Sequence, residues 1–243
     1  MSSVEVGLDG GVAHIWLNRP ERLNAVAEVL VDDLLAALDT VARSGAGAVV
    51  LAGRGRAFCA GHDLKQPEPE GDSRARLERL QDVTRRLRAL PQPVIAAVHG
   101  YAIGAGAEFA LGCDLILAAE DAVFSFPETG LGLSVTGAAS RLLPQLVGPL
   151  KAKELLLLGE RIDAATALRL GLVNAVVPDV AAAAADWARR IAARPAGAVT
   201  LAKRALDAAI ELEPALELEV SHALLTEHTP EVARSAAAFR SRE

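Results

Sequence analysis

Several kinds of residue and pattern are scarce in this 243-residue chain, and each shortage argues against a class of protein. Cysteine occurs only twice, at Cys59 and Cys113, both in apolar surroundings of small residues. Counting alone allows one disulfide. The absence of a recognisable signal peptide instead leads us to expect a cytoplasmic protein whose cysteines act as small buried hydrophobes.

Long apolar runs and paired metal ligands are missing as well. No apolar run approaches the ~18 residues that a membrane span requires, so we expect no membrane association. The five histidines show no paired ligand spacing, and we therefore expect no metal site. They are His14, His62, His99, His222 and His228.

Positive charge is in deficit too. The formal net charge of −6 argues weakly against non-specific nucleic-acid binding. The longest basic cluster, residues 74–88, alternates with apolar residues at helical spacing. We interpret this cluster as the solvated face of an amphipathic helix rather than as a phosphate groove.

The chain is rich in small aliphatic residues. About half of its residues (51%) are apolar, but aromatic residues make up only 3%. The core must therefore be built mainly from Ala, Val, Leu and Ile, with close backbone approach at its 20 glycines. The length suffices for one large core, or for one core with an appended subdomain.

Strands and helices are expected to alternate up to about residue 178, which predicts an α/β fold with parallel strands. Beyond Pro178 the pattern is helical throughout, and we expect these helices to dock on the first domain or on neighbouring subunits. The expected strands are 4–7, 12–17, 48–52, 94–98, 115–119, 123–126 and 173–177, and the expected helices are 28–43, 73–90, 144–158, 164–170, 180–193, 197–212 and 214–227.

The most informative stretch runs from Pro93 to Gly130. An apolar strand leads into a turn of small residues, Gly104-Ala105-Gly106, which opens a helix. The first amides of a helix have no partners within the helix, and the helix dipole favours negative charge there. The turn is therefore a candidate binding site for an anionic oxygen.

A second source of free N–H groups is the segment Ala57–Leu64. Gly61 lets the backbone turn sharply and leaves the N–H of His62 outside any strand ladder. Donors at residue 62 and in the turn at 104–106 could together hold the oxygen of a thioester enolate. Close packing of a helix on a strand, without catalytic meaning, explains the same glycines. A dinucleotide site is not indicated, because the GxGxxG pattern is absent.

Two carboxylates follow, Glu108 in the first turn of the expected helix and Glu128 in a loop after a strand. Each could be structural: Glu108 as a complement to the helix dipole, Glu128 as an ordinary loop acid or cap. The apolar neighbours of Glu108 instead indicate burial, and buried carboxylates with raised pKa values are often functional. Two acids beside one anion hole could add or remove water across an activated double bond.

The chain resembles the crotonase superfamily, the enoyl-CoA hydratase/isomerase family, over nearly its full length. The motifs that carry the resemblance lie in order at residues 18–25, 57–64, 94–119, 124–133, 140–148 and 159–178. The resemblance implies a crotonase-like spiral core of ββα turns, at residues 1–190, that contains the acyl-CoA site. It also implies a C-terminal helical region, residues 191–243, that mediates assembly into a homotrimer or a dimer of trimers.

The resemblance further implies an acyl-CoA thioester substrate and a role in lipid metabolism. No separate cofactor is implied, because coenzyme A is part of the substrate. Glu108 would orient and activate the water, Glu128 would serve the α-carbon proton, and the amides of His62 and Ala105 would form the oxyanion hole. The implied substrate-binding residues are Ala60, Gly61, His62, Asp63, Leu64, Lys65, Gly104 and Ala105.

The chain departs from the family pattern at several positions. His62 replaces the usual Ala of hydratases, Ala105 replaces a common Gly, and residues 134–139 lack the usual Pro and Gly-Gly-Thr. Retention of both acids favours an enoyl-CoA hydratase. An isomerase, a decarboxylase or a thioester hydrolase remain alternatives within the fold, and a non-catalytic or RNA-binding scaffold is an alternative outside enzyme chemistry.

Overall fold

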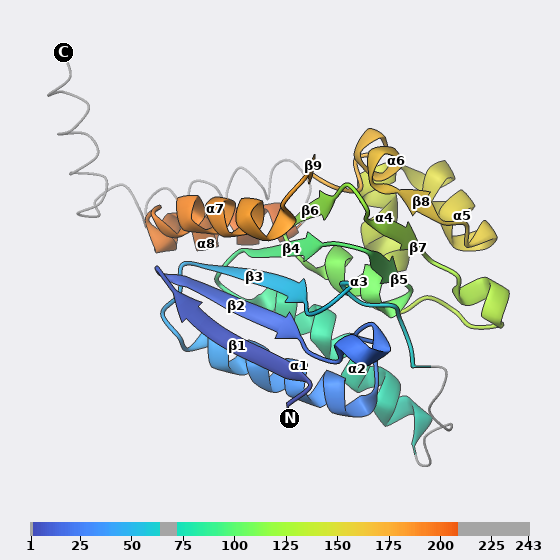
Figure 1. Cartoon of the computed structure of the whole chain (residues 1–243), viewed down its shortest axis with the longest axis horizontal. Coiled ribbons are helices and arrows are strands. Elements are labelled where there is room, and N and C mark those ends of the chain that lie inside the picture. The colour runs from blue at the N-terminus through green and yellow to red at the C-terminus, as the bar shows by residue number, and fades with distance from the viewer. Residues whose placement is uncertain (1, 64–71, 209–243) are drawn as a thin grey trace, which may run out of the picture.

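The computed structural model of the chain describes residues 2–63 and 72–208 (Figure 1). Its main element is a six-stranded sheet in the order β1-β2-β3-β4-β6-β9. Only β1 is antiparallel to its neighbour, and the remaining strands run parallel. The strands are β1 (Val4–Asp9), β2 (Val12–Leu17), β3 (Ala48–Gly53), β4 (Val94–Val98), β6 (Leu115–Ala119) and β9 (Ala175–Val177). The predicted α/β fold with parallel strands is confirmed.

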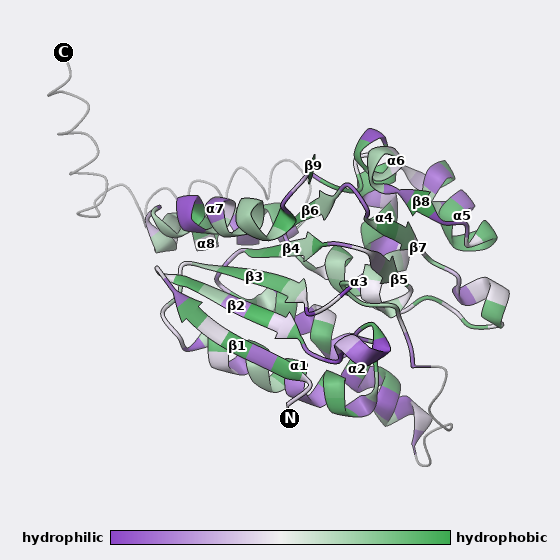
Figure 2. Ribbon diagram, in the orientation of Figure 1, coloured by the Kyte–Doolittle hydropathy of each residue, from purple (hydrophilic) through white to green (hydrophobic). Residues whose placement is uncertain are grey.

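Helices cover both faces of this sheet. Figure 1 shows α1 (Glu28–Ala42) and α2 (Ser73–Ala89) along one face and α7 (Val180–Ala192) along the other. Side chains alternate across a strand, so Val49 and Leu51 of β3 join the core under α1, whereas Val50 joins the core under α7. This double burial explains why the central strands read as continuous apolar runs, which are green in Figure 2.

The basic cluster at residues 74–88 is the outer side of α2, as predicted. Its apolar side packs inward through Leu80, Val83 and Leu87, and Figure 2 shows both characters on this helix. Arginines on its outer side pair with acids of α1, for example Arg79 with Asp32. The cluster is therefore occupied by ion pairs at the protein surface.

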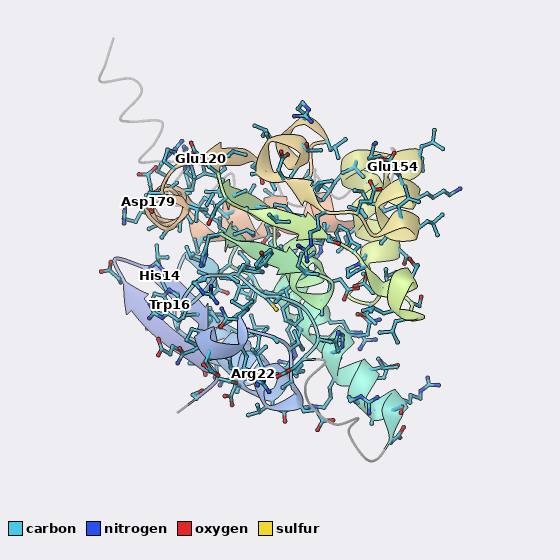
Figure 3. All side chains as sticks on the ribbon, turned by 45° about the vertical axis from the view of Figure 1, so that its right-hand side comes forward. His14, Trp16, Arg22, Glu120, Glu154 and Asp179 are labelled. Atoms are coloured by element: carbon cyan, nitrogen blue, oxygen red, sulfur yellow. The ribbon has the colours of Figure 1, made fainter. Side chains whose placement is uncertain are left out.

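Two aromatic rings of β2, His14 and Trp16, lie next to each other and to the side chain of Arg54. His14 and Trp16, labelled in Figure 3, stack with ring centroids 5.3 Å apart. The guanidinium of Arg54 lies 4.1 Å from the centre of the Trp16 ring and also pairs with Glu5 at 2.7 Å. Burial lowers the pKa of His14 below its ordinary value. This group contains one of only two tryptophans in the chain, and it lies on the main sheet.

A second, smaller sheet was not predicted from the sequence. Its first strand ends directly before Gly104, the N-cap of the next helix. This sheet pairs β5 (Tyr101–Ile103) in parallel with β7 (Val123–Ser125), and β7 antiparallel with β8 (Ile162–Asp163). The strand β5 is only three residues long and is bounded by Gly100 and Gly104, both at positive φ. Such a short run has no periodicity to detect. It delivers the chain directly into α3 (Ala105–Gly112).

The predicted helix 144–158 is wrong as a single element. The structure has two helices, α4 (Ala139–Val147) and α5 (Pro149–Leu158). Gly148 between them has φ 78°, a left-handed conformation, and Pro149 opens the second helix. The remaining helices are α6 (Ala164–Arg169) and α8 (Ala196–Ala208), with short 3-10 turns at Pro20–Arg22 (η1) and Glu128–Leu131 (η2).

The predicted helix 214–227 lies outside the described residues. Within residues 2–63 and 72–208, no helix is both long and apolar enough to cross a membrane. Cys59 and Cys113 are buried free thiols, and burial raises the pKa of Cys59 to about 12. They are small core residues, as the sequence suggested.

Candidate active site

The segment around His62 is held between two neighbours. On one side Cys59 pairs in parallel with Ala102 of β5, with hydrogen bonds from Cys59 N–H to Tyr101 O (2.9 Å) and from Ile103 N–H to Cys59 O (3.0 Å). On the other side Val26 donates to Gly61 O (2.7 Å) and accepts from Asp63 N–H (2.9 Å). In such a parallel bridge the N–H of His62 faces away from Val26. Among the described residues, that N–H has no acceptor.

The backbone of residue 61 requires glycine, just after Cys59 pairs with β5. Its φ is +85°, and a Cβ there would lie 2.7 Å from the carbonyl oxygen of Ile103 and 3.9 Å from the Cα of Gly104. A side chain would therefore meet backbone atoms that cannot move aside. The close approach places residue 61 directly beside the start of α3.

A loop near the N-terminus fixes the other side of this segment. The carboxylate of Asp63 pairs with Arg19 (3.0 Å) and Arg22 (3.6 Å) and is almost fully buried. Asn24 is completely buried, and its amide donates to the carbonyls of Arg54 (2.9 Å) and Ala57 (2.8 Å). Two arginines of the motif at residues 18–25 thus hold the Asp63 side chain, and this fixes the backbone next to His62. Sequence reasoning did not identify this role of the motif.

The start of α3 provides the second set of free amides. Gly104 is its N-cap, at φ +52°, and no side chain of the described residues caps the helix. Glu108 N–H donates to Gly104 O at 2.9 Å, whereas the N–H groups of Ala105 and Gly106 have no acceptor among the described residues. Ala105 is only 1% exposed. Unpartnered amides at a helix N-terminus form an anion-binding site when a ligand reaches them.

Glu108 lies in the first turn of α3 and is 1% exposed. Burial raises the pKa of this carboxyl above its ordinary value, while two hydrogen bonds from Thr136 act in the opposite direction. The Thr136 N–H donates to Glu108 Oε1 at 2.6 Å, and the Thr136 hydroxyl contacts Glu108 Oε2. Glu108 is therefore a buried carboxylate that two donors from one residue hold in place.

Glu128 also lies beside the start of α3, and it follows β7 of the smaller sheet. It opens η2 after β7 and is 9% exposed. Its Oε1 lies 2.9 Å from the point that a Cβ on Gly104 would occupy, and its buried Oε2 has no hydrogen-bond partner within residues 2–63 and 72–208. Burial is the largest effect that raises the pKa of Glu128, and the negative charge of Glu108 raises it further. The two acids thus interact beside the start of α3.

The structure brings most of the predicted site residues together. Gly61 lies against Ile103 and Gly104, Gly104 lies against Glu128, and Glu128 interacts electrostatically with Glu108. Ala60 is half-buried in the same segment and donates its N–H to Leu23 O at 3.0 Å. Leu64 and Lys65 lie outside the described residues. Two acids with raised pKa values next to unpaired amides could exchange protons with a substrate whose oxygen those amides hold.

The residue His62 keeps part of its surface in solvent, whereas Cys59 and Gly61 are buried, and its ring is partly desolvated. Desolvation of the ring is the main cause that lowers the pKa of His62, and the positive charge of Arg76 on α2 lowers it further. The neutral ring is therefore favoured near pH 7. The backbone donor of residue 62 does not depend on this side chain.

Thr136 is a site residue that sequence reasoning missed. It lies eight positions beyond Glu128, in the stretch where the chain departs from the family pattern. No spacing rule links a threonine in a loop to a glutamate 28 residues earlier. Only the folded chain places them in contact.

The chain is similar to known proteins over most of its length. The sequence model described as Enoyl-CoA hydratase/isomerase matches residues 7–242. "Probable enoyl-CoA hydratase echA6" of Mycobacterium bovis is 41% identical over 204 residues, which cover 82% of this chain and 81% of that protein. The "1,2-epoxyphenylacetyl-CoA isomerase" of Escherichia coli is 36% identical over 243 residues, which cover 96% and 93% of the two chains.

Solved structures give the same result for the fold. The crystal structure of an enoyl-CoA hydratase from Bacillus anthracis superimposes with a TM-score of 0.94 at 32% sequence identity. The match covers 99% of this chain and 97% of that one. The α/β architecture is therefore that of the crotonase fold, as the sequence motifs indicated.

Proposed function

Because the chain belongs to the enoyl-CoA hydratase/isomerase family, we propose that it adds water across the double bond of a 2-enoyl-CoA thioester. The observation that carries this proposal is the pair of interacting buried acids, Glu108 and Glu128, beside the amides that begin α3, which have no acceptor among the residues that the structure describes. Hydration needs one group to activate water and one to deliver a proton to carbon. The site offers one carboxyl for each step.

In the proposed mechanism the thioester carbonyl oxygen accepts hydrogen bonds from the N–H groups of His62 and Ala105. Those donors stabilise the enolate oxygen that develops as the nucleophile attacks, and each such donor is typically worth about 3 kcal/mol of barrier. Ala60, Gly61, Asp63, Leu64, Lys65 and Gly104 would form the surrounding wall for the thioester and coenzyme A.

Glu108 is the proposed general base. It removes a proton from water as the oxygen attacks the β-carbon. Glu128 is the proposed general acid, and it delivers a proton to the α-carbon of the enolate. Burial raises the pKa values of both carboxyls, which brings each closer to neutral pH, where proton transfer in either direction is efficient.

The proposal also includes the oligomeric state and the cellular location of the protein. We expect a homotrimer or a dimer of trimers in the cytoplasm, with residues 191–243 as the oligomerisation region. No nucleic acid, membrane or separate cofactor enters the proposed reaction.

The test is turnover of crotonyl-CoA in water enriched in oxygen-18. The conjugated thioester absorbance should decay, and the 3-hydroxyacyl product should carry one heavy oxygen. Glu108→Gln and Glu128→Gln should each lower kcat by about 10²- to 10⁴-fold, because each removes one proton-transfer group. Glu120→Gln makes the same chemical change at an exposed position, labelled in Figure 3, and should leave kcat unchanged.

Other outcomes of the same assay would indicate one of the alternative functions. Double-bond migration without incorporation of heavy oxygen would replace hydration by isomerisation. Loss of carbon dioxide from malonyl-type thioesters, or release of free coenzyme A, would indicate a decarboxylase or a hydrolase. Binding of acyl-CoA without any turnover would indicate a scaffold.

A further inference from the structure

Thr136 contacts both oxygens of Glu108 with two different groups. Its N–H donates to Oε1 at 2.6 Å and its hydroxyl contacts Oε2. We propose that Thr136 is a positioning residue that clamps the Glu108 carboxylate and makes it the base of the two acids, an inference that rests on the proposed hydration. An ionised carboxylate only accepts hydrogen bonds, so the threonine hydroxyl must be the donor.

The backbone around Thr136 is shaped for this contact. Gly137 has φ +55°, and a Cβ there would lie 2.6 Å from the Cβ of Glu108. The next residue, Ala138, also has positive φ (60°), which is costly for a residue with a side chain. The hydroxyl of Thr84, on α2, lies 3.4 Å from the carbonyl oxygen of Gly137. The strained turn at residues 137–138 thus packs against Glu108, and the Thr84 hydroxyl holds it in place on α2.

The clamp distinguishes two otherwise similar carboxyls. Glu108 has a donor from Thr136 on each oxygen, whereas Glu128 has a hydrogen bond from its own backbone and a buried Oε2 without a partner among the described residues. Hydrogen bonds to a carboxylate stabilise its charged form, and two nearby carboxylates in a dry site resist carrying two negative charges. A single negative charge shared by the two acids therefore resides on Glu108, and the proton resides on Glu128.

This arrangement supplies the division of labour that hydration needs. The base must be ionised before water attacks, and the acid must hold a proton before the enolate forms. The donor geometry also fixes the direction in which the remaining lone pairs of Glu108 point, because both of its oxygens are held. Thr136 therefore acts through Glu108 and not on the substrate.

The matched variants are Thr136→Val and Thr136→Ser. Valine keeps the shape and the backbone N–H but loses the hydroxyl, whereas serine keeps the hydroxyl and loses the methyl group. We expect Thr136→Val to lower kcat by about ten- to hundredfold, as for loss of a hydrogen bond to a charged group, with little change in KM. Thr136→Ser should restore most of that loss. A role limited to packing of the methyl group would give the reverse order.

The pH dependence gives a second readout. Loss of the hydroxyl donor removes an effect that lowers the pKa of Glu108, so this pKa rises in Thr136→Val. A smaller fraction of the base is then ionised at a given pH, and the acidic limb of the kcat profile should move to higher pH. An unmoved limb in a correctly folded Thr136→Val variant would overturn the clamp.

A measurement without substrate keeps the two proposals separate. The Glu108 carboxyl can be titrated by carbon-13 NMR of protein labelled at glutamate, with its signal identified by its loss in Glu108→Gln. An upward shift of this titration in Thr136→Val, but not in Thr136→Ser, supports the clamp even if the wild type hydrates no thioester. Superimposed titrations overturn the clamp even if hydration is active.

Discussion

Gly106 lies so close to Cys59 that there is no room for a side chain between them. A Cβ on Gly106 would be 2.2 Å from the carbonyl oxygen of Cys59 and 2.8 Å from its Cβ. This contact presses the first turn of α3 onto the segment that carries His62. The distance between the two proposed oxyanion donors therefore depends on a missing methyl group.

We expect Gly106→Ala to lower the free energy of unfolding by about 1–3 kcal/mol, because one of the two packed segments must shift. Gly197→Ala is the matched control, since Gly197 is also helical but a Cβ there would meet no atom of the described residues within 4 Å. Replacement of a helical glycine in open space should be neutral or stabilising by up to ~1 kcal/mol. Urea denaturation of the two variants measures both effects, and equal stabilities would contradict the tight contact.

At the scale of elements, a buried lysine is one of the contacts that attach α8 to the rest of the molecule, beside the Thr200 hydroxyl on Pro91 O (2.9 Å) and the ion pair between Asp207 and Arg88. Lys203 is 7% exposed, and its ammonium lies 2.8 Å from Asp114 Oδ2 and 3.2 Å from each of the carbonyl oxygens of Leu87 and Gln92. Asp114 also accepts the N–H of Val94, the first residue of β4, at 2.7 Å. One buried cation thus joins α8 to the end of α2 and to the residues that precede β4 and β6.

We expect Lys203→Met to lower the free energy of unfolding by about 3–5 kcal/mol, because it leaves the buried Asp114 carboxylate without its cation. Lys151→Met removes an exposed ion pair with Glu154 (2.6 Å) and should cost less than ~1 kcal/mol. Chemical denaturation measures both. A Lys203→Met variant as stable as Lys151→Met would show that α8 is held by other contacts.

At the scale of the whole molecule, two apolar cores lie on opposite faces of one sheet. Within the described residues, the core under α1, α2 and α3 contains all of the fully buried phenylalanines, whereas the buried part of the core under α7 contains only small and aliphatic residues. Ala184 and Ala188 of α7 are both 0% exposed against the sheet. Their small side chains allow α7 to lie close to the strands.

We expect Ala184→Leu to lower the free energy of unfolding by about 1–3 kcal/mol through overpacking of this second core. Ala181→Leu makes the same change at an exposed position of the same helix and should stay within about 0.5 kcal/mol of the wild type. Thermal or urea denaturation distinguishes the two. Equal effects would mean that α7 is not seated on the sheet as described.

Sequence patterns were sufficient for the elements of the main sheet and for the helices that cover it. Strands such as residues 94–98 are short, continuously apolar and bounded by Pro and His-Gly, so their identity does not depend on distant residues. The helix predicted at 144–158 was wrong because a glycine at positive φ followed by proline divides it. The three-residue β5 was not predicted, because its pairing with β7 depends on residues 22 positions away.

The sequence by itself determined which groups could do chemistry. Gly61, the turn at 104–106, Glu108 and Glu128 are recognisable because glycine freedom, free helix amides and acids among apolar neighbours are local properties. Only the tertiary structure decided how the two acids differ, because the packing of distant segments places Thr136 on Glu108 and buries Glu128 Oε2 away from any partner in the part of the chain that the structure describes. The electrostatic environment of a buried group is set by everything packed around it, and a linear pattern does not contain that information.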